Sequence, residues 1–278
     1  MSISVAAPDF VKGHGTENDF VLLPDPDDVL DLTAGRVRAL CDRQAGIGGD
    51  GVIRVVPVRD GGPERFFMDY YNADGSVAEM CGNGARLFAR YLVDAGWAEP
   101  GSIVFRTRGG TRVARLAAVG DVSVEMGPAV LGTRSRALVG HHEYAGVAVD
   151  VGNPHLVCAG VVDEAALAAL DLTRQPDFDP QVFPDGVNIE FVTVLGVEEV
   201  AMRVHERGVG ETRSCGTGTV AVAAAHLAGS GRAVGRVAVR VPGGRVTVDI
   251  TAGASTLTGP AVIVARGRVD AGFWAAHR

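Results

Sequence analysis

The chain has 278 residues, of which 47% are hydrophobic and 21% are charged, and its formal net charge is −7 at pH 7. This length is enough for two domains of ordinary size and a substantial core. The acidic charge argues against a general nucleic-acid-binding surface. No apolar run approaches the roughly 18 residues of a membrane span. Residues 1–10 contain an acid and no base, so we expect neither a secretory signal nor a membrane partner.

Cysteine and lysine usage narrows the possible cofactors. The four cysteines form no Cys-x-x-Cys pair and are too few for a disulfide scaffold, which argues against structural zinc and indicates a reducing cytoplasm. Pyridoxal-phosphate enzymes hold their cofactor through a lysine. The only lysine is Lys12, which ends an apolar run before a glycine turn and is interpreted as a strand residue. We therefore expect neither a metal nor an organic cofactor.

Hydrophobic patterning and glycine turns predict the elements of the first half. Strands are expected over residues 9–11, 20–23, 52–58, 65–71, 103–107, 112–116 and 122–126. One helix is expected over 32–42, and a second begins directly after Cys81 and ends near Gly96.

The second half repeats this scheme. Strands are expected over residues 145–150, 156–161, 188–193, 199–205, 237–241, 246–250 and 262–266. Helices are expected over 164–170 and directly after Cys215. Alternating strands, glycine hairpins and one apolar helix in each half indicate an α+β fold, with a mixed sheet wrapped around that helix.

One short motif occurs twice. The stretches Cys81-Gly82-Asn83-Gly84 and Cys215-Gly216-Thr217-Gly218 each precede an apolar helix. A cysteine there faces the unpaired N–H groups and positive dipole end of the helix, so its thiolate is favoured. The glycines let backbone N–H groups approach a bound anion. Either copy alone could equally be a glycine turn holding a buried cysteine.

The two copies belong to a longer internal repeat. Their cysteines are 134 residues apart (215 − 81), and further landmarks recur in the same order, such as Asp50-Gly51-Val52 with Asp185-Gly186-Val187. This period is too long for a solenoid. It predicts a duplicated domain: two pseudo-symmetric lobes, residues 1–131 and 132–265, with an active-site cleft between them. The tail, 266–278, is expected to join the first lobe.

Polar residues occupy equivalent loop positions around the two cysteines. They are Asn72-Ala73-Asp74-Gly75, Asn153-Pro154-His155, Asn188 and Glu206-Arg207. Together they fit a zwitterionic ligand, with Arg207 and backbone N–H groups on its carboxylate. Two thiols on opposite faces of such a substrate can take the α-proton from one side and return one from the other. Without pyridoxal, the carbanion must be stabilised by a dry, preorganised site. Cys41 and Cys158 lack the motif and are interpreted as packing residues.

With these motifs the chain resembles the diaminopimelate epimerase family, within the cofactor-independent amino-acid racemase superfamily that includes proline racemase. The resemblance spans nearly the whole chain. It rests on a set of motifs that is specific as a whole: residues 13–20, 72–76, 80–86, 152–155, 187–188, 206–212 and 214–218. It implies interconversion of LL- and meso-2,6-diaminopimelate, in lysine and peptidoglycan-precursor synthesis. It also implies two pseudo-symmetric lobes and a homodimer.

The resemblance also implies residue roles. Cys81 and Cys215 would form the acid–base pair, with His155 and Glu206 supporting the thiols. Gly82-Asn83 and Gly216-Thr217 would bind the reacting carboxylate. The residues holding the substrate would be Asn18, Asn72, Asn153, Asn188, Glu206 and Arg207.

Two departures and two alternatives accompany this interpretation. Many family members have a glutamine contacting the ligand where this chain has Gly51, and a C-terminal tyrosine in dimer packing where it has Val264-Ala265-Arg266. The first alternative is a proline-type racemase, although Asn72, Asn153 and Asn188 favour a longer substrate with a second amino-acid head. The second is a dithiol redox protein in which Cys81 and Cys215 form a disulfide.

Overall fold

The computed structural model describes residues 7–277, which divide into two compact units. Unit 1 contains the chain up to Val124 and again from Pro260 onward, and unit 2 contains Glu125–Gly259. The division falls a few residues before each boundary expected from the sequence. The first expected boundary lies inside strand β8 (Val130–Val139), which pairs with β9 (His142–Asp150) along most of its length and therefore belongs to unit 2.

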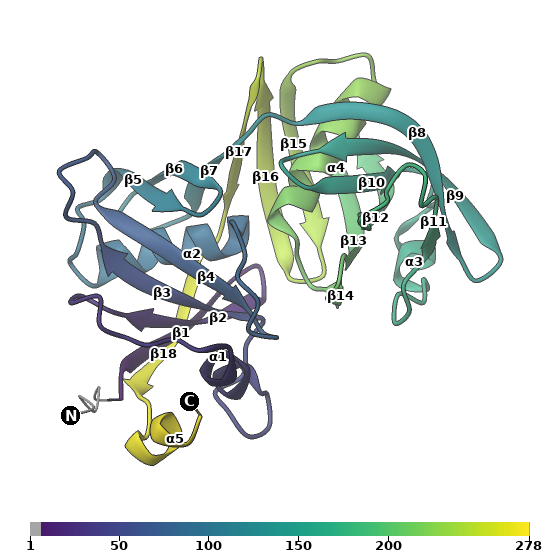
Figure 1. The fold of residues 1–278 in the computed structure, drawn as a ribbon. Helices are drawn as coiled ribbons and strands as arrows, with labels where there is room; N and C mark the ends of the chain where they lie inside the picture. Colours follow the sequence, from purple (N-terminus) through teal and green to yellow (C-terminus); the bar gives the residue numbers. More distant parts are fainter. Residues whose placement is uncertain (1–6, 278) are drawn as a thin grey trace. The chain divides into compact units, whose positions relative to one another are not determined.

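Unit 1 is built on a mixed sheet. Its strands are β1 (Asp9–Gly15), β2 (Asn18–Pro24), β3 (Gly51–Pro57), β4 (Phe66–Asn72), β5 (Gly101–Thr107), β6 (Gly110–Leu116), β7 (Val122–Gly127), which crosses the division, and β18 (Val262–Arg268). They pair in the order β18-β1-β2-β3-β4-β5-β6-β7, with β2–β3 and β4–β5 parallel and the other pairs antiparallel. In Figure 1 the C-terminal strand β18, in yellow, runs beside the N-terminal strand β1, in purple.

Unit 2 repeats the same pairing scheme. Besides β8 and β9 it contains β10 (Pro154–Cys158), β12 (Asn188–Gly196), β13 (Glu199–Glu206), β15 (Gly235–Val241), β16 (Gly244–Thr251) and β17 (Ala254–Gly259). The order is β8-β9-β10-β12-β13-β15-β16-β17, with β10–β12 and β13–β15 parallel and the rest antiparallel. Two short strands, β11 (Asp177–Phe178) and β14 (Gly210–Thr212), flank β8 and β13.

Each sheet packs against one buried helix. In unit 1 this is α2 (Gly82–Asp94), which is buried from Gly82 to Leu92 and contacts β1, β2, β6 and β18. In unit 2 it is α4 (Gly216–Gly229), which contacts β10, β12, β15 and β16. The predicted α+β fold, with a mixed sheet around a central helix in each half, is confirmed.

Three shorter helices lie outside these central elements. They are α1 (Ala34–Cys41), α3 (Glu164–Ala168) and α5 (Ala271–Ala276). Helix α1 begins at Ala34 because the Thr33 side chain caps it by accepting the N–H of Arg36. Within the part of the chain that the structure describes, no helix is both long and apolar enough to span a membrane.

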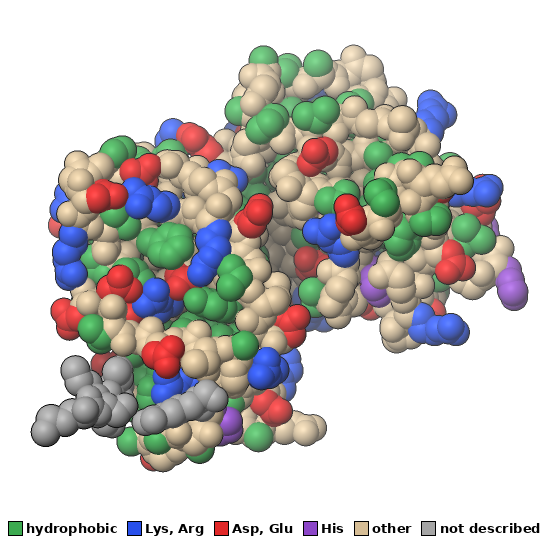
Figure 2. Space-filling model, viewed as in Figure 1, with side chains coloured by type: hydrophobic (Ala, Val, Ile, Leu, Met, Phe, Trp, Pro, Cys, Tyr) green, Lys and Arg blue, Asp and Glu red, His purple; other side chains and the backbone are tan. Residues whose placement is uncertain are grey.

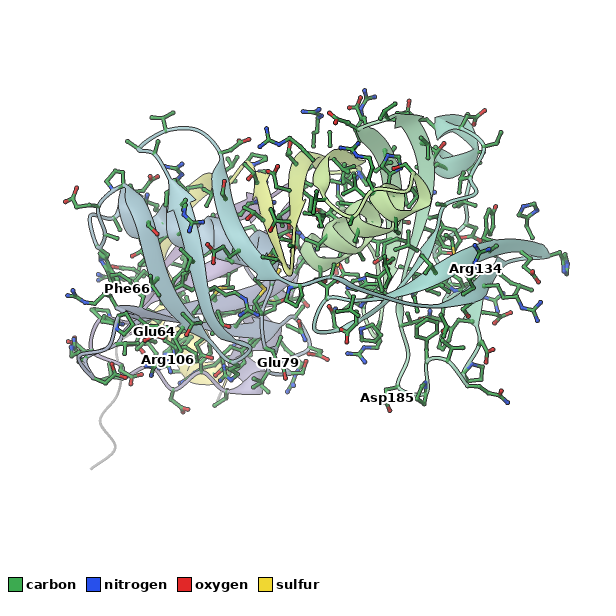
Figure 3. All side chains as sticks on the ribbon, turned by 90° about the horizontal axis from the view of Figure 1, so that it is seen from above. Glu64, Phe66, Glu79, Arg106, Arg134 and Asp185 are labelled. Atoms are coloured by element: carbon green, nitrogen blue, oxygen red, sulfur yellow. The ribbon has the colours of Figure 1, made fainter. Side chains whose placement is uncertain are left out.

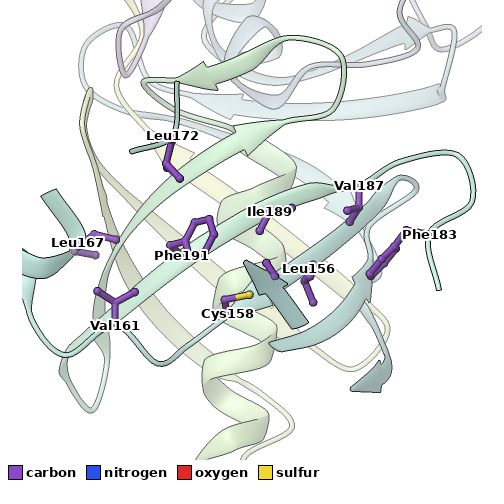
Figure 4. Packing of buried hydrophobic residues seen from close by; sticks show 11 residues of the cluster. Leu156, Cys158, Val161, Leu167, Leu172, Phe183, Val187, Ile189 and Phe191 are labelled. Atoms are coloured by element: carbon purple, nitrogen blue, oxygen red, sulfur yellow. The ribbon is translucent and has the colours of Figure 1, made fainter. Parts of the chain in front are cut away.

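The two cysteines outside the repeated motif lie in the cores. Cys158 is fully buried in the unit 2 cluster, among the side chains that include Leu156 and Phe191 (Figure 4). Cys41 is buried in a unit 1 cluster with Leu40 and Trp274. Burial raises the pKa of each thiol to about 12. Both are therefore packing residues. The surface differs from these cores, because charged side chains of both signs are interspersed on the face shown in Figure 2.

Candidate active site

In unit 1 the thiol of Cys81 caps helix α2. Cys81 has an extended backbone (φ −137°, ψ 121°), and its Sγ accepts a hydrogen bond from the N–H of Gly84 at 3.4 Å. In the loop that precedes Cys81, the carbonyl of Glu79 (labelled in Figure 3) accepts a hydrogen bond from the N–H of Gly109 at 3.0 Å. The sequence thus places a sulfur atom at the end of the helix where negative charge is favoured.

Asn18 contacts this sulfur, and Asn83 contacts Asn18. The Cys81 thiol lies 3.6 Å from Oδ1 of Asn18, which also accepts a hydrogen bond from Asn83 Nδ2 at 3.1 Å. The amide nitrogen of Asn18 donates to Asp50 at 2.7 Å. An ionised carboxylate can only accept hydrogen bonds. Asp50 therefore turns the NH₂ group of Asn18 toward itself and the carbonyl oxygen toward the thiol.

The cation Arg86 lies in the same unit. Its side chain is fully buried on α2 and donates to Thr16 Oγ1 at 3.0 Å and to the carbonyl of Pro260 at 3.2 Å. Burial lowers the pKa of Arg86 to about 10, and the charge of Cys81 opposes this shift. The guanidinium thus stays charged at neutral pH.

Asn72 belongs to a separate polar group at the end of β4. Its Oδ1 accepts from the Tyr70 hydroxyl at 3.0 Å, and its Nδ2 donates to Ser76 Oγ at 3.0 Å. The structure therefore brings Asn18, Asn83 and Gly82 together around Cys81, whereas Asn72 is the last residue of β4 and contacts Tyr70 and Ser76.

In unit 2 Cys215 caps helix α4 in the same way. Its backbone is extended (φ −121°, ψ 118°), and its Sγ accepts from the N–H of Gly218 at 3.4 Å. The sulfur also lies 3.5 Å from the hydroxyl of Thr217. Burial, followed by the charges of Glu206 and Glu190, raises the pKa of Cys215 well above its ordinary range, while Thr217 and Gly218 lower it.

The carboxyl group of Glu206 is hydrogen-bonded to this thiol. It accepts a hydrogen bond from the hydroxyl of Thr212. Burial raises the pKa of Glu206, and hydrogen bonds from Thr212 and Cys215 oppose that shift. A carboxylate whose pKa is raised toward neutrality is a stronger base than one in water. A buried thiol thus lies beside a half-buried carboxyl group.

His155 and Asn153 continue the polar network of Cys215. Asn153 Nδ2 donates to Thr217 Oγ1 at 3.4 Å, and Asn153 Oδ1 lies 3.0 Å from His155 Nε2. The other ring nitrogen of His155 lies 2.7 Å from Glu190 Oε1, and both side chains are fully buried. His155 thus reaches the thiol through two intermediate side chains.

Asn188 and Arg207 lie beside this network. Asn188 Nδ2 donates to the carbonyl of Pro154 at 2.9 Å, and Asn188 Oδ1 accepts the N–H of Arg207 at 3.0 Å. The Arg207 guanidinium donates to the carbonyl of Asp185, labelled in Figure 3, at 3.3 Å. The parallel pairing of β10 with β12 places His155 opposite Asn188, which explains why these distant residues meet.

Two acidic residues of these networks were not assigned a role from the sequence. Asp50 orients Asn18, and Glu190 contacts His155. The signal for Glu190 was present, because it is a single acid within the apolar run Ile189–Val192, and a charged residue on a buried strand needs a partner. Asp50 was noticed only as a landmark of the repeat.

Comparison with known proteins shows the family to which the chain belongs. The diaminopimelate epimerase family model matches residues 10–132 and again 147–269. A diaminopimelate epimerase from Rhodococcus jostii is 52% identical over 285 residues, covering 96% of this chain and 98% of the relative.

Solved structures show the same fold. A phenazine biosynthesis protein of the PhzF family from Bacillus anthracis has a TM-score of 0.72 at 14% identity, covering 95% of this chain and 99% of that one. A hydroxyproline epimerase from Agrobacterium vitis has a TM-score of 0.68 at 15% identity, with coverages of 95% and 92%.

The matching family model and the near-full-length relatives show that the chain, with its two repeated α+β units, is an isomerase of the amino-acid racemase and epimerase class. The double match of the family model and the full-length relatives identify the particular protein: the chain belongs to the diaminopimelate epimerase family.

Proposed function

We propose that the protein interconverts LL- and meso-2,6-diaminopimelate without an added cofactor, using Cys81 and Cys215 as its two proton-transferring groups. The observation that carries the proposal is the repeated Cys-Gly-x-Gly helix cap, one in each unit, in a chain 52% identical to a curated diaminopimelate epimerase. The reaction would serve the synthesis of lysine and of peptidoglycan precursors.

In the proposed reaction one sulfur acts as a thiolate and the other as a thiol. The thiolate takes the α-proton: the Cα–H bond breaks, an S–H bond forms, and the electron pair is delocalised into the α-carboxylate. The thiol on the opposite face gives its proton to the same carbon, which inverts its configuration. When Cys215 is the base, Glu206 accepts its proton beforehand, and this role is supported by the hydrogen bond between them.

The first turns of α2 and α4 would hold the reacting carboxylate. The backbone N–H groups at Gly82-Asn83 and Gly216-Thr217 lie in the first turns of these buried helices and are suited to an oxyanion that gains charge in the transition state. The polar side chains that would hold the rest of the substrate are Asn18, Asn72, Asn153, Asn188, Glu206 and Arg207. The Arg207 guanidinium is suited to a second, non-reacting carboxylate.

The alternative functions have weaker support. The hydroxyproline epimerase shares the fold but only 15% identity, which does not extend its substrate to this chain. A dithiol redox role leaves the polar side chains around each thiol without a purpose. None of the four cysteines, all of which lie within the described residues, forms a disulfide.

We further propose that the enzyme is a cytoplasmic homodimer. Val262 and Val264 expose 42% and 62% of their surface on β18, the strand at one end of the unit 1 sheet. Apolar side chains on an edge strand suit an interface with a second copy. Sedimentation velocity should show a dimer that Val264→Glu dissociates; a wild-type monomer at all concentrations would refute this.

The deciding experiment for the reaction is incubation of the purified enzyme with LL-diaminopimelate alone, with the stereoisomers separated by chromatography. We expect meso-diaminopimelate to form without any added cofactor, and proline not to be racemised. Turnover of proline but not of diaminopimelate would favour the proline-type racemase instead.

A further inference from the structure

We propose that Arg86 is a positioning residue: it holds the turn between β1 and β2 in a strained conformation, and that turn places Asn18 against the thiol of Cys81. This inference rests on the proposed role of Cys81 as a proton-transferring group. It goes beyond the roles that the resemblance implies, because neither Arg86 nor the turn residue Thr16 is given a function there.

The turn between β1 and β2 is strained. Gly15 pairs with Asn18, so the hairpin is closed by only two residues, Thr16 and Glu17. Both have positive φ angles, 50° and 59°, which residues with a side chain rarely adopt. Asparagine and glycine are the usual residues of such a turn, and a β-branched threonine is poorly suited to it. A turn of this sequence therefore needs contacts from the rest of the fold to hold it.

Arg86 supplies one such contact from helix α2. Its Nη2 donates to Thr16 Oγ1 at 3.0 Å, and its Nε donates to the carbonyl of Pro260 at 3.2 Å. The directions of these bonds are fixed, since a guanidinium can only donate. Thr16 is 1% exposed and Arg86 is fully buried, so little water can compete for the bond between them. Arg86 thus ties the turn to the segment that leads into β18.

The turn also lies directly against the start of the same helix. A Cβ atom added to Gly15 would lie 2.8 Å from the carbonyl oxygen of Asn83 and 2.9 Å from Nη2 of Arg86. On the other side of the turn, Asn18 Oδ1 accepts from Asn83 Nδ2 at 3.1 Å and lies 3.6 Å from the Cys81 sulfur. The turn residue that Arg86 holds is two positions before Asn18, so a change in the turn would move Asn18 relative to the sulfur.

The charge of Arg86 is costly for the fold. The two acceptors of its hydrogen bonds, a hydroxyl and a carbonyl, are neutral. Among the residues that the structure describes, its third nitrogen, Nη1, has no hydrogen-bond partner. Burying a cation with neutral or missing partners costs free energy, and burial accordingly lowers the pKa of Arg86 to about 10. An apolar side chain of similar length would fill this space at lower cost, which indicates a role other than stability.

Arg90 provides a matched comparison on the same helix. It lies one turn further along α2, is also buried, and donates to the carbonyls of Ala117, Ala118 and Gly120. It also lies 3.8 Å from the carboxylate of Asp94. The loop that it holds joins β6 to β7 and supplies none of the residues proposed to contact the substrate. Variants of the two arginines therefore separate positioning from general stability.

Variants of Arg86 and of the turn test the positioning role. Arg86→Met removes the guanidinium, and Thr16→Val removes its acceptor but keeps a β-branched side chain, whereas Thr16→Ser keeps the acceptor. In a further variant the Arg86→Met chain also carries Thr16→Asn and Glu17→Gly, because asparagine and glycine adopt this turn by themselves. Each protein is measured by steady-state epimerisation of LL-diaminopimelate, by thermal unfolding, and by hydrogen exchange of the peptide spanning residues 13–20.

We expect kcat to fall about tenfold in Arg86→Met and in Thr16→Val, in line with the loss of one hydrogen bond to a charged group. Hydrogen exchange in residues 13–20 should become faster in both, and Thr16→Ser should keep most of the wild-type kcat. The Tm of Arg86→Met should stay the same or rise. Adding Thr16→Asn and Glu17→Gly should restore most of its activity. Arg90→Met, in contrast, should lower Tm and leave kcat unchanged.

Three results would overturn the inference. The first is a folded Arg86→Met protein with wild-type kcat. The second is an Arg86→Met protein with lower Tm whose activity the turn substitutions do not restore, which would indicate a role in stability. If Arg86→Met does not fold, a wild-type kcat in Thr16→Val decides against the positioning role. Failure of the proposed function would appear separately, as full epimerisation by Cys81→Ala, because hydrogen exchange tests the hold on the turn without turnover.

Discussion

At the scale of single residues, the four cysteines divide into two kinds by their surroundings. Cys81 and Cys215 accept N–H groups at the start of buried helices, next to polar side chains. Cys41 and Cys158 lie among apolar side chains, where a thiol behaves as a small hydrophobic group. Residue type alone does not separate these roles, whereas the position of the thiol relative to a helix does.

Alanine substitutions should separate the two kinds. Cys81→Ala and Cys215→Ala should each abolish epimerisation, because each removes the proton transfer on one face of the substrate. Cys41→Ala and Cys158→Ala should lower the free energy of unfolding by about 1–3 kcal/mol and leave turnover intact. Chiral chromatography and thermal unfolding measure both effects, and a folded Cys41→Ala protein without activity would contradict this division.

The buried thiols also predict how stability depends on pH. Burial raises the pKa of Cys41 and Cys158 from 9.0 to about 12 in the folded protein. Between these values the folded state binds more protons than the unfolded state, so stability is lost as pH rises through that range, by about 1.4 kcal/mol per pH unit for each thiol. Urea unfolding of the wild type and of Cys41→Ala/Cys158→Ala should show a shallower alkaline loss in the variant. Equal slopes would argue against these shifts.

Asp50 should matter through the direction of Asn18. Asp50→Asn introduces an NH₂ group that can turn the Asn18 amide over, so that a donor replaces the acceptor facing Cys81. We expect kcat to fall about tenfold, in line with one altered hydrogen bond to a charged group. Asp60→Asn, which loses only an exposed pair with Arg106, is the matched control and should keep its activity. Equal activities of the two variants would remove the role of Asp50.

At the scale of elements, the central helices supply the positive ends on which both thiols depend. Each helix begins with glycines because side chains there would meet its neighbours: a Cβ at Gly84 would lie 2.9 Å from Ile53 Cδ1, and one at Gly218 2.6 Å from Glu190 Oε1. Glycine therefore meets two requirements of the first turn: it allows close packing against the neighbouring side chains, and it leaves the backbone N–H groups uncovered by a side chain of its own.

Two glycines of the same helix provide a matched test. Gly218→Ala must displace the carboxyl group of Glu190 and should reduce kcat. Gly229→Ala, at the exposed end of α4 with nothing within 4 Å of the added Cβ, should keep its activity and gain up to about 1 kcal/mol of stability. Steady-state kinetics and thermal unfolding check both. A fully active Gly218→Ala protein would show that the first turn tolerates displacement of Glu190.

At the scale of the whole molecule, the chain contains the same strand pairing twice. β18 completes the sheet of unit 1 as β8 completes that of unit 2, so that the C-terminus returns to the unit that contains the N-terminus. The family model also matches twice, once to each half. The duplication supplies two equivalent helix-capping thiols, which is the number that a reaction with one base on each face requires.

Solvent isotope incorporation tests this two-base reaction. In D₂O the early product should carry deuterium at the α-carbon, because its new hydrogen comes from a thiol that exchanged with solvent, while remaining substrate stays protonated. The same labelling is expected whether the reaction starts from LL- or from meso-diaminopimelate. NMR of the first few turnovers measures it. Early product that retains the original hydrogen would indicate a single base and would remove the reason for pairing Cys81 with Cys215.

Much of the fold was predictable because its signals are local. The central helices and most strands follow from apolar periodicity, and the duplication from the recurring motifs. The strands β8, β11, β14 and β17 and the helix α5 were not predicted. β8 is mostly exposed and contains a glycine and three basic or hydroxyl residues between Leu131 and Arg136, so it shows no apolar alternation. Its extended form comes from pairing with β9, which no local pattern reveals.

The sequence by itself determined where each thiol stands, because a cysteine before Gly-x-Gly and an apolar helix caps that helix whatever surrounds it. Only the tertiary structure decided what each thiol meets. Parallel pairing of β10 with β12 brings His155 within 2.7 Å of Glu190, 35 residues away, and packing of α4 against those strands brings both near Cys215. These contacts depend on strand register and helix packing, which are properties of the assembled sheet rather than of any one segment.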